Sequence, residues 1–262
     1  MRPSVDPLEF VISLARRAGA LLRDRFDDPH EVVEKRPLDL VTEADRASEA
    51  AIVAAIRAEF PAASILAEEG GEYAGSGDER FIVDPLDGTT NYAHRYPLFC
   101  VSIAYECAGR LEAAAIDAPL LGMTFAARRG RGATLNGAPM RVSTVARLDR
   151  ALVCTGFNPS RYDRNGSHFA ALSRATQGVR RDGSAALDLA LVAAGRFEAF
   201  WEWDLRPWDV AAGALLVEEA GGQVSAIDGR AHRLDGGSIA ASNGCVHPAF
   251  TSLLVSVGEK TL

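Results

Sequence analysis

Lysine is almost missing from this chain of 262 residues, because it occurs only at Lys35 and Lys260. Acidic residues outnumber basic ones, with 35 Asp and Glu against 28 Lys and Arg and a formal net charge of −7. An acidic chain is a poor general binder of polyanions, since its overall field repels them. Nucleic acid is therefore an unlikely partner in our interpretation.

Cysteine is also scarce. The four cysteines (Cys100, Cys107, Cys154 and Cys245) show no C-x-x-C spacing, and three of them lie in apolar runs typical of strands. In such runs cysteine behaves as a small hydrophobic residue. This pattern favours a reducing, cytoplasmic compartment.

Long apolar runs are missing too. No run approaches the length needed to cross a bilayer, and residues 1–10 lack a basic segment followed by a long apolar one. The chain has no internal repeat and no low-complexity linker, and its 48% of hydrophobic residues is ordinary for a globular protein. We expect a soluble, unexported protein without a membrane partner.

The hydrophobic pattern predicts two halves, residues 1–145 and 146–262, each mixing helices and strands. In the first half it predicts helices over 7–26 and about 43–60, and strands at 64–67, 80–84, 99–106, 111–117 and 123–129. The polar segment 30–40 contains Pro37 and predicts an exposed loop that ends in extended residues 39–42.

In the second half the pattern changes, and strands alternate with helices. Strands are predicted at 152–155, 179–181, 197–203, 223–227 and 238–241, with helices near 162–176, 184–194, 208–220 and 248–257. No Pro/Ser-rich hinge occurs near residue 145. We therefore expect the halves to pack tightly as one unit with the functional site between them.

The most informative motif places two carboxylates on one tight turn: Phe81-Ile82-Val83-Asp84-Pro85-Leu86-Asp87-Gly88-Thr89-Thr90. Two such acids repel each other unless a cation lies between them, and hard cations such as Mg²⁺ prefer carboxylate and carbonyl oxygens. Pro85 fixes the path of the chain, so that the carbonyl of Leu86 can turn toward the ion. The motif predicts a divalent-metal site.

The residues after the two acids favour an anion. Gly88 permits a close approach, and Thr89 to Asn91 are typical of the first turn of a helix, where unpaired N–H groups attract phosphate. An ordinary Asp-Gly turn with capping hydroxyls explains the dipeptide alone, whereas the whole run favours a phosphate site.

Three further segments place carboxylates at the ends of predicted elements: Glu68-Glu69-Gly70-Gly71, Asp39 to Asp45, and Trp208-Asp209-Val210-Ala211-Ala212-Gly213. Each also has a structural explanation, a solvated acidic turn for the first and helix-capping charge for the other two. Since neighbours in a strand point to opposite faces, only one of Glu68 and Glu69 is expected to reach a metal.

These four segments, in this order and spacing, resemble the inositol monophosphatase family of metal-dependent phosphatases over nearly the whole chain. Asp84 to Asn91 is similar to the family's first signature, and Trp208 to Gly213 followed by Glu219-Ala220-Gly221-Gly222 is similar to its second. The resemblance implies an α/β (α+β) fold, the layered αβαβα sandwich shared with fructose-1,6-bisphosphatase. It also implies two or three Mg²⁺ ions, with Mn²⁺ as an alternative, sensitivity to Li⁺ and a homodimer.

The resemblance assigns roles residue by residue. The implied metal ligands are Glu68, Asp84, Leu86 (through its carbonyl), Asp87 and Asp209, with Thr89 beside the first ion. The implied catalytic residues are Asp45, Thr89 and Glu68, of which Asp45 and Thr89 position and deprotonate water. The implied substrate-binding residues are Asp87, Gly88, Thr89, Gly183, Ser184, Ala185, Glu202 and Asp209, and Lys35 matches a basic residue of the loop after the first helix.

The expected activity is hydrolysis of inositol 1-phosphate or a similar small polyol phosphate. Asp117-Ala118-Pro119 replaces a more usual Tyr-Asp-Pro, and Trp201 and Trp203 flank Glu202, so histidinol phosphate, fructose 1,6-bisphosphate and 3′-nucleotides stay open as substrates. A regulatory member that binds protein or RNA is the alternative from another class, against which the intact ligand set argues.

Two other features receive no role in the reaction. The cluster Arg128-Arg129-Gly130-Arg131 is interleaved with glycine and predicts a solvated turn rather than a phosphate site. His94 follows the first signature, and we expect it to pack or hydrogen-bond structurally.

Overall fold

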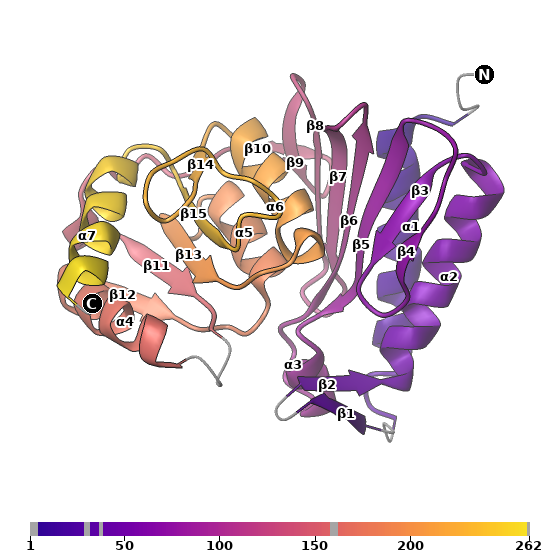
Figure 1. Ribbon diagram of the computed structural model, residues 1–262, viewed down its shortest axis with the longest axis horizontal. Helices are drawn as coiled ribbons and strands as arrows, with labels where there is room; N and C mark the ends of the chain where they lie inside the picture. The colour runs from indigo at the N-terminus through magenta and orange to yellow at the C-terminus, as the bar shows by residue number, and fades with distance from the viewer. Residues whose placement is uncertain (1–4, 29–31, 37–38, 158–161, 261–262) are drawn as a thin grey trace.

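A computed structural model of the chain describes residues 5–28, 32–36, 39–157 and 162–260 (Figure 1). The first half forms an eight-stranded sheet in the order β10-β9-β8-β7-β6-β5-β3-β4. Its strands are β3 (Ser64–Ala67), β4 (Gly71–Tyr73), β5 (Glu79–Asp87), β6 (Cys100–Cys107), β7 (Arg110–Ala118), β8 (Met123–Arg128), β9 (Gly132–Leu135) and β10 (Ala138–Met140). Only β3 and β5 pair in parallel; the other neighbours are antiparallel.

The second half forms a five-stranded sheet in the order β12-β11-β13-β15-β14. Its strands are β11 (Leu152–Thr155), β12 (Gly178–Arg180), β13 (Ala199–Trp203), β14 (Gln223–Ser225) and β15 (Ser238–Ser242). β11 pairs in parallel with both β12 and β13, so their carboxyl ends share one edge. A short 3₁₀ helix, η1 (Leu148–Arg150), leads into β11.

The helices complete five layers, as Figure 1 shows. α1 (Pro7–Asp24) and α2 (Glu43–Glu59) cover the outer face of the large sheet, and α5 (Ala185–Ala193) and α6 (Pro207–Glu219) lie between the two sheets. α4 (Tyr162–Ala175) and α7 (His247–Lys260) cover the small sheet, and the short α3 (Thr89–Ala93) follows β5. The predicted αβαβα sandwich is confirmed.

The layering explains where the helices are apolar. α5 is buried along almost its whole length and α6 along its middle, residues 210–217, because a helix between two sheets has little surface toward water. α1, on the outside, buries only one stripe that includes Val11, Leu14 and Leu22. The middle core joins both halves of the chain, with Ile82 and Cys100 from one half beside Leu187 and Leu215 from the other.

The main differences from the sequence-based prediction are short strands. Residues 39–42 are extended as predicted, but they form a strand, β2 (Asp39–Thr42), which pairs with β1 (Val32–Arg36) where a loop was predicted. Residues 29–31 and 37–38 lie outside the described part. β4, β9 and β10 were not predicted either. Each of these three short strands contains a Gly or Pro, residues that are uncommon in strands, so the local pattern does not identify them and they depend on pairing with a neighbour.

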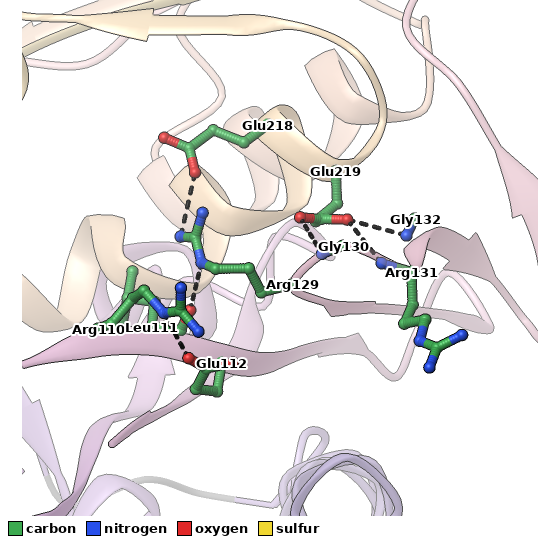
Figure 2. A network of polar contacts seen from close by, with 9 residues as sticks. All are labelled: Arg110, Leu111, Glu112, Arg129, Gly130, Arg131, Gly132, Glu218 and Glu219. Atoms are coloured by element: carbon green, nitrogen blue, oxygen red, sulfur yellow. Dashed lines mark hydrogen bonds and ion pairs between the residues drawn. The ribbon is translucent and has the colours of Figure 1, made fainter. Parts of the chain in front are cut away.

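The glycine-interleaved arginines form the turn between β8 and β9, as predicted, but the turn is bound to protein rather than only solvated (Figure 2). The carboxylate of Glu219, at the end of α6, accepts the N–H groups of Gly130, Arg131 and Gly132 at 2.8, 3.2 and 2.8 Å. These hydrogen bonds therefore hold the C-terminal end of α6 against the large sheet.

None of the helices in the described ranges is long and apolar enough to span a bilayer.

Candidate active site

A polar cavity of about 190 Å³ is lined by residues from both halves of the chain. Its lining residues are Leu40, Glu68, Asp84, Leu86, Asp87, Gly88, Thr89, Thr90, Gly183 and Asp209. Eight of these ten were predicted as site residues, and Leu40 and Thr90 were not. A larger hollow of about 380 Å³ beside α7 holds none of the predicted residues.

Parallel pairing places Glu68 and Asp84 at the same level. Ala67 of β3 is in register with Val83 of β5, so the residue after each lies at a shared edge of the sheet. The regular pairing of β5 with β6 then breaks between Asp84 and Asp87. The N–H of Leu86 donates to Oδ1 of Asp84 at 3.0 Å, which holds the turn close to the strand end.

Asp87 connects this turn to the second half. Its Oδ2 accepts the Ser184 hydroxyl at 2.6 Å and the Ala186 N–H at 2.7 Å, both at the start of α5. Ser184 is the N-cap residue of α5, and Ala185 is its first residue. Neither Ser184 nor Ala185 lines the cavity; the structure places them behind Asp87, where they orient its carboxylate.

Asp45 lies behind Thr89 and is fully buried. Its Oδ2 accepts both the N–H and the hydroxyl of Thr42 at 2.8 and 2.6 Å, which forms the capping box of α2. Its Oδ1 accepts the Thr89 hydroxyl at 2.9 Å, and the same hydroxyl lies 3.1 Å from the Leu86 carbonyl. Since Thr89 has one hydroxyl proton, it donates to only one of them at a time.

Asp209 and Glu202 come from the other side. Asp209 lies in the first turn of α6, where its Oδ2 accepts the N–H of Arg206 at 2.6 Å. Glu202, on β13, is 8% exposed and does not line the cavity. Its carboxylate lies against Gly156, where a Cβ would be only 2.4 Å from a Glu202 oxygen, so only glycine fits there.

The electrostatics of the cavity are those of crowded carboxyl groups. Burial first, and then the charges of Glu68, Asp87 and Asp209, raise the pKa of Asp84 well above its usual value. The pKa of Asp209 is raised in the same way, by burial and by Asp87, with Arg206 opposing. The carboxylate and carbonyl groups that could bind a metal in this cavity all present oxygen atoms, which hard divalent cations prefer as ligands. Within the described residues, no three acidic, His or Cys side chains are already grouped tightly enough to hold an ion.

Several residues that shape the site were not predicted. Ser48, on α2, donates to the Pro85 carbonyl at 2.9 Å, and Glu49 on the same helix accepts the N–H groups of Glu69 and Gly70. With Asp45, these polar side chains occupy the buried face of α2. The signal was present in the sequence, since residues 45, 48 and 49 have the spacing of one helix face.

The amide of Asn91, on α3, joins the halves at the cavity. Its Nδ2 donates to the carbonyl of Leu98 at 2.6 Å and to that of Asp182 at 2.7 Å. Gly183 has φ +85°, and a Cβ there would lie 3.0 Å from Oδ1 of Asn91, so both its backbone and its neighbour favour glycine.

Asp188 of α5 is 1% exposed, and its Oδ1 has no hydrogen-bond partner among the described residues. Lys35 lies in β1, but its side chain falls outside the described part, so its predicted role receives no structural account.

Comparison with known proteins agrees with this architecture. The sequence profile of the inositol monophosphatase family matches residues 5–259. A Pseudomonas aeruginosa protein named Nus factor SuhB is 47% identical over 261 residues, covering 95% of each chain. A Synechocystis inositol-1-monophosphatase is 44% identical over 258 residues, covering 96% of this chain and 90% of the relative.

Solved structures are similar as well. The inositol monophosphatase from Anabaena (Nostoc) superposes with a TM-score of 0.85 at 42% identity and 95% coverage of both chains. The Thermotoga maritima IMPase superposes with a TM-score of 0.91 at 37% identity, covering 98% of this chain and 100% of that one. By fold, by sequence and by the order of its signatures, the chain belongs to the inositol monophosphatase family.

Proposed function

We propose that this protein is a Mg²⁺-dependent phosphomonoesterase that hydrolyses inositol 1-phosphate or a similar small polyol phosphate in the cytoplasm. One observation carries the proposal: a single cavity gathers four carboxylates from three separate segments and the Leu86 residue, beside the hydrogen-bonded pair of Thr89 and Asp45. Membership of the family supports the same activity.

The residues present fit two divalent ions. Glu68, Asp84 and the Leu86 carbonyl would hold one ion, and Asp84, Asp87 and Asp209 the other; Glu68 would also serve a weaker third. Asp84 and Asp209 each use one carboxylate oxygen for a backbone N–H, and no described residue donates to the other oxygen. When bound, the ions acidify a water molecule and offset negative charge on the leaving oxygen. Mn²⁺ would suit the same oxygen donors.

Thr89 and Asp45 would prepare the attacking water. When Thr89 donates its proton to Asp45, its hydroxyl oxygen keeps lone pairs that can accept a hydrogen bond from water. Burial raises the pKa of Asp45, which makes this carboxylate a better proton acceptor than an exposed aspartate. The pair therefore orients the water and takes up its proton.

The phosphate group and the alcohol part of the substrate would contact different residues of the site. Gly88, in the left-handed region with φ +99°, and Thr89 begin α3 and would offer N–H groups to the phosphate. Gly183 and Glu202 approach from the second half, where Glu202 would accept hydroxyl hydrogens of a polyol. Burial and the charges of Asp209 and Asp87 raise the pKa of Glu202, so this carboxyl group binds a proton more strongly than an exposed glutamate.

The test is phosphate release from myo-inositol 1-phosphate, glycerol 2-phosphate, histidinol phosphate, fructose 1,6-bisphosphate and adenosine 3′,5′-bisphosphate, each with Mg²⁺ and with EDTA. We expect release that requires Mg²⁺ and is fastest for a polyol monophosphate. A preference for one of the last three substrates would reassign the leaving group. No release from any substrate would contradict the enzyme proposal.

Asp87→Asn removes a proposed ligand charge, so kcat should fall by more than the roughly 10–100-fold typical of losing an outer-shell partner. Initial rates at saturating Mg²⁺ measure the effect. Because asparagine can keep the hydrogen bond to the Ser184 hydroxyl, folding should be retained, which circular dichroism checks. Activity within about tenfold of wild type would contradict the ligand assignment.

Thr89→Ala removes the hydroxyl that would lie between Asp45 and the water, together with one methyl group. We expect kcat to fall by about 100-fold or more, as for loss of a positioned proton-transfer group, while the Mg²⁺ concentration for half-maximal activity changes little. A Mg²⁺ titration of both proteins separates the two parameters. Equal loss of metal affinity and turnover would indicate a structural role for Thr89.

Two further properties belong to the proposal: inhibition by Li⁺ and assembly as a homodimer. Inhibition is measured by adding LiCl to the same assay, with KCl at equal ionic strength as the control. Sedimentation equilibrium measures the mass in solution, which for a dimer is twice the 27.9 kDa of the chain.

A regulatory function is the second candidate, because relatives at 47% and 43% identity are named Nus factor SuhB. Such a role would use another surface and would survive loss of catalysis. Salt-sensitive retention of RNA by both the wild-type protein and Asp87→Asn would support it. Retention by neither would leave the phosphatase as the only proposed function.

A further inference from the structure

The turn that carries Glu68 is held from behind by a buried carboxylate. Residues 68–70 connect β3 to β4 as a three-residue hairpin, with Ala67 paired to Gly71. Glu49 on α2 is 5% exposed, and its Oε2 accepts the Glu69 N–H at 2.8 Å while Oε1 accepts the Gly70 N–H at 2.7 Å. Both N–H groups that follow Glu68 are therefore directed toward α2 rather than into the cavity.

The neighbours of Glu49 keep it in this position. The Tyr73 hydroxyl, from β4, donates to Oε1 at 3.3 Å, and the guanidinium of Arg57, two turns along α2, lies 5.2 Å from the centre of the Tyr73 ring. Gly70 leaves room for these side chains, since a Cβ there would lie 2.0 Å from the Tyr73 oxygen and 2.7 Å from Oε1 of Glu49. A side chain at this position would displace the Tyr73 hydroxyl and the Glu49 carboxylate from the positions that they occupy beside the turn.

We infer that Glu49 is a positioning residue, which fixes the Glu68 turn so that the Glu68 carboxylate stands at the metal cavity. The inference rests on the proposed function and extends it to a residue outside the cavity. The preceding residue, Ser48, holds the Pro85 carbonyl of the other ligand-bearing turn. One turn of α2 thus sets the relative position of both acidic turns.

The test compares two carboxylates in the same kind of contact. Glu219 also accepts consecutive backbone N–H groups of a hairpin turn, but it lies at the end of α6 and does not line the cavity (Figure 2). In either position, Gln replaces one accepting oxygen by an NH₂ group that faces a backbone N–H. Glu49→Gln and Glu219→Gln therefore make matched changes to a turn, one beside the site and one remote.

The readout is binding of Mn²⁺ alone, by isothermal titration calorimetry, to the metal-free protein. We expect Glu49→Gln to raise the dissociation constant by about 10–100-fold, the range seen when an outer-shell partner of a metal ligand is lost. Glu219→Gln should bind Mn²⁺ as tightly as wild type, even if both variants unfold at similar, lower urea concentrations. Equal affinity in Glu49→Gln and wild type, or equal loss in both variants, would overturn the inference.

A second variant separates position from charge. Gly70→Ala keeps the charge of Glu49 but adds a methyl group that overlaps the Tyr73 and Glu49 oxygens, which disturbs the contact between Glu49 and the turn, so Mn²⁺ affinity should fall here too. The contrary result is a Gly70→Ala variant that binds Mn²⁺ as tightly as wild type while Glu49→Gln binds it more weakly. That result would show that the charge of Glu49 matters rather than its hydrogen bonds to the turn, and it would refute a positioning role. Wild-type protein that binds no Mn²⁺ would instead overturn the proposed function itself.

Discussion

At the scale of single residues, burial decides which protonation state a side chain keeps, and His247 illustrates this away from the cavity. Its Nε2 lies 3.0 Å from the Ser225 hydroxyl, and its Nδ1 lies 2.8 Å from that of Ser242. Since Ser225 donates its proton to the Ala226 carbonyl at 2.8 Å, it must accept from Nε2. A neutral imidazole with its proton on Nε2 fits this network, since the Ser242 hydroxyl can then donate its proton to Nδ1.

Burial lowers the pKa of His247 below its usual value of 6.5. The unfolded chain therefore binds this proton more readily than the folded chain, so the contribution of His247 to folding stability falls as the pH drops below about 6.5. We expect this contribution to the free energy of unfolding to decline between pH 7 and pH 5, with a slope of at most about 1.4 kcal/mol per pH unit.

Urea unfolding of wild type and His247→Gln at pH 5, 6 and 7 measures the contribution of the imidazole. The difference between the two proteins isolates it from His232, whose pKa is also lowered by burial and which adds a slope of the same sign. The variant should be less stable at pH 7, and its disadvantage should shrink at pH 5. A pH-independent difference would contradict the assigned neutral state.

At the scale of elements, the closest approach of α5 and α6 depends on Gly213. A Cβ at this position would lie 2.5 Å from Cβ and 2.6 Å from Cδ1 of Leu189. Asp209 begins the same helix, so a displacement of α6 would also reach the cavity. The apolar pattern predicted the helix, whereas only the packing shows why one of its residues has no side chain.

We expect Gly213→Ala to destabilise the protein by about 1–3 kcal/mol, the usual cost of overpacking a core, despite a helix propensity gain of about 1 kcal/mol. Gly258→Ala in α7 is the matched control, because the nearest atom to its Cβ would be 3.9 Å away. That variant should be neutral or slightly more stable. Urea unfolding compares them, and a stabilised Gly213→Ala would show that the helices can separate without cost.

At the scale of the whole molecule, two asparagine amides tie together the halves of the chain. Asn91 bridges Leu98 and Asp182 beside the cavity. Asn243, which is 3% exposed, donates to the Ser143 hydroxyl at 2.9 Å and the Val145 carbonyl at 2.8 Å, far from any cavity residue in sequence. The two amides make similar hydrogen bonds. Only Asn91 binds Asp182, which lies two positions before Ser184, and the Ser184 hydroxyl donates to Asp87.

Asn91→Ala and Asn243→Ala should both lose stability, by about 1–3 kcal/mol for the unsatisfied carbonyls. Only Asn91→Ala should lower kcat/KM, by about tenfold or more, because Ser184 and Ala186 would no longer be held in place to orient Asp87. Steady-state kinetics and urea unfolding of both variants separate these effects. Equal activity of the two variants would show that the halves keep their alignment without Asn91.

Much of the architecture was predictable from local pattern. The six longest helices and most strands were predicted near their observed bounds, because each of these helices carries a full period of apolar residues. The capping role of Thr42 and the first-turn positions of Asp45 and Asp209 were predicted for the same reason, since helix starts are local in sequence. The catalytic and ligand roles of the site residues, and the division near residue 145, stay predictions.

The sequence by itself determined the family, the order of elements and the residues that carry charge to the cavity, because turns, caps and periodicity depend on neighbours within a few positions. Only the tertiary structure decided which groups hydrogen-bond to those residues and their neighbours and so fix their positions. Glu49 meets Glu69 from 20 positions away, and Asn91 meets Asp182 from 91 positions away. No local pattern encodes such pairs, since each one exists only after the sheet and the helix layers have packed and water has been excluded from between them.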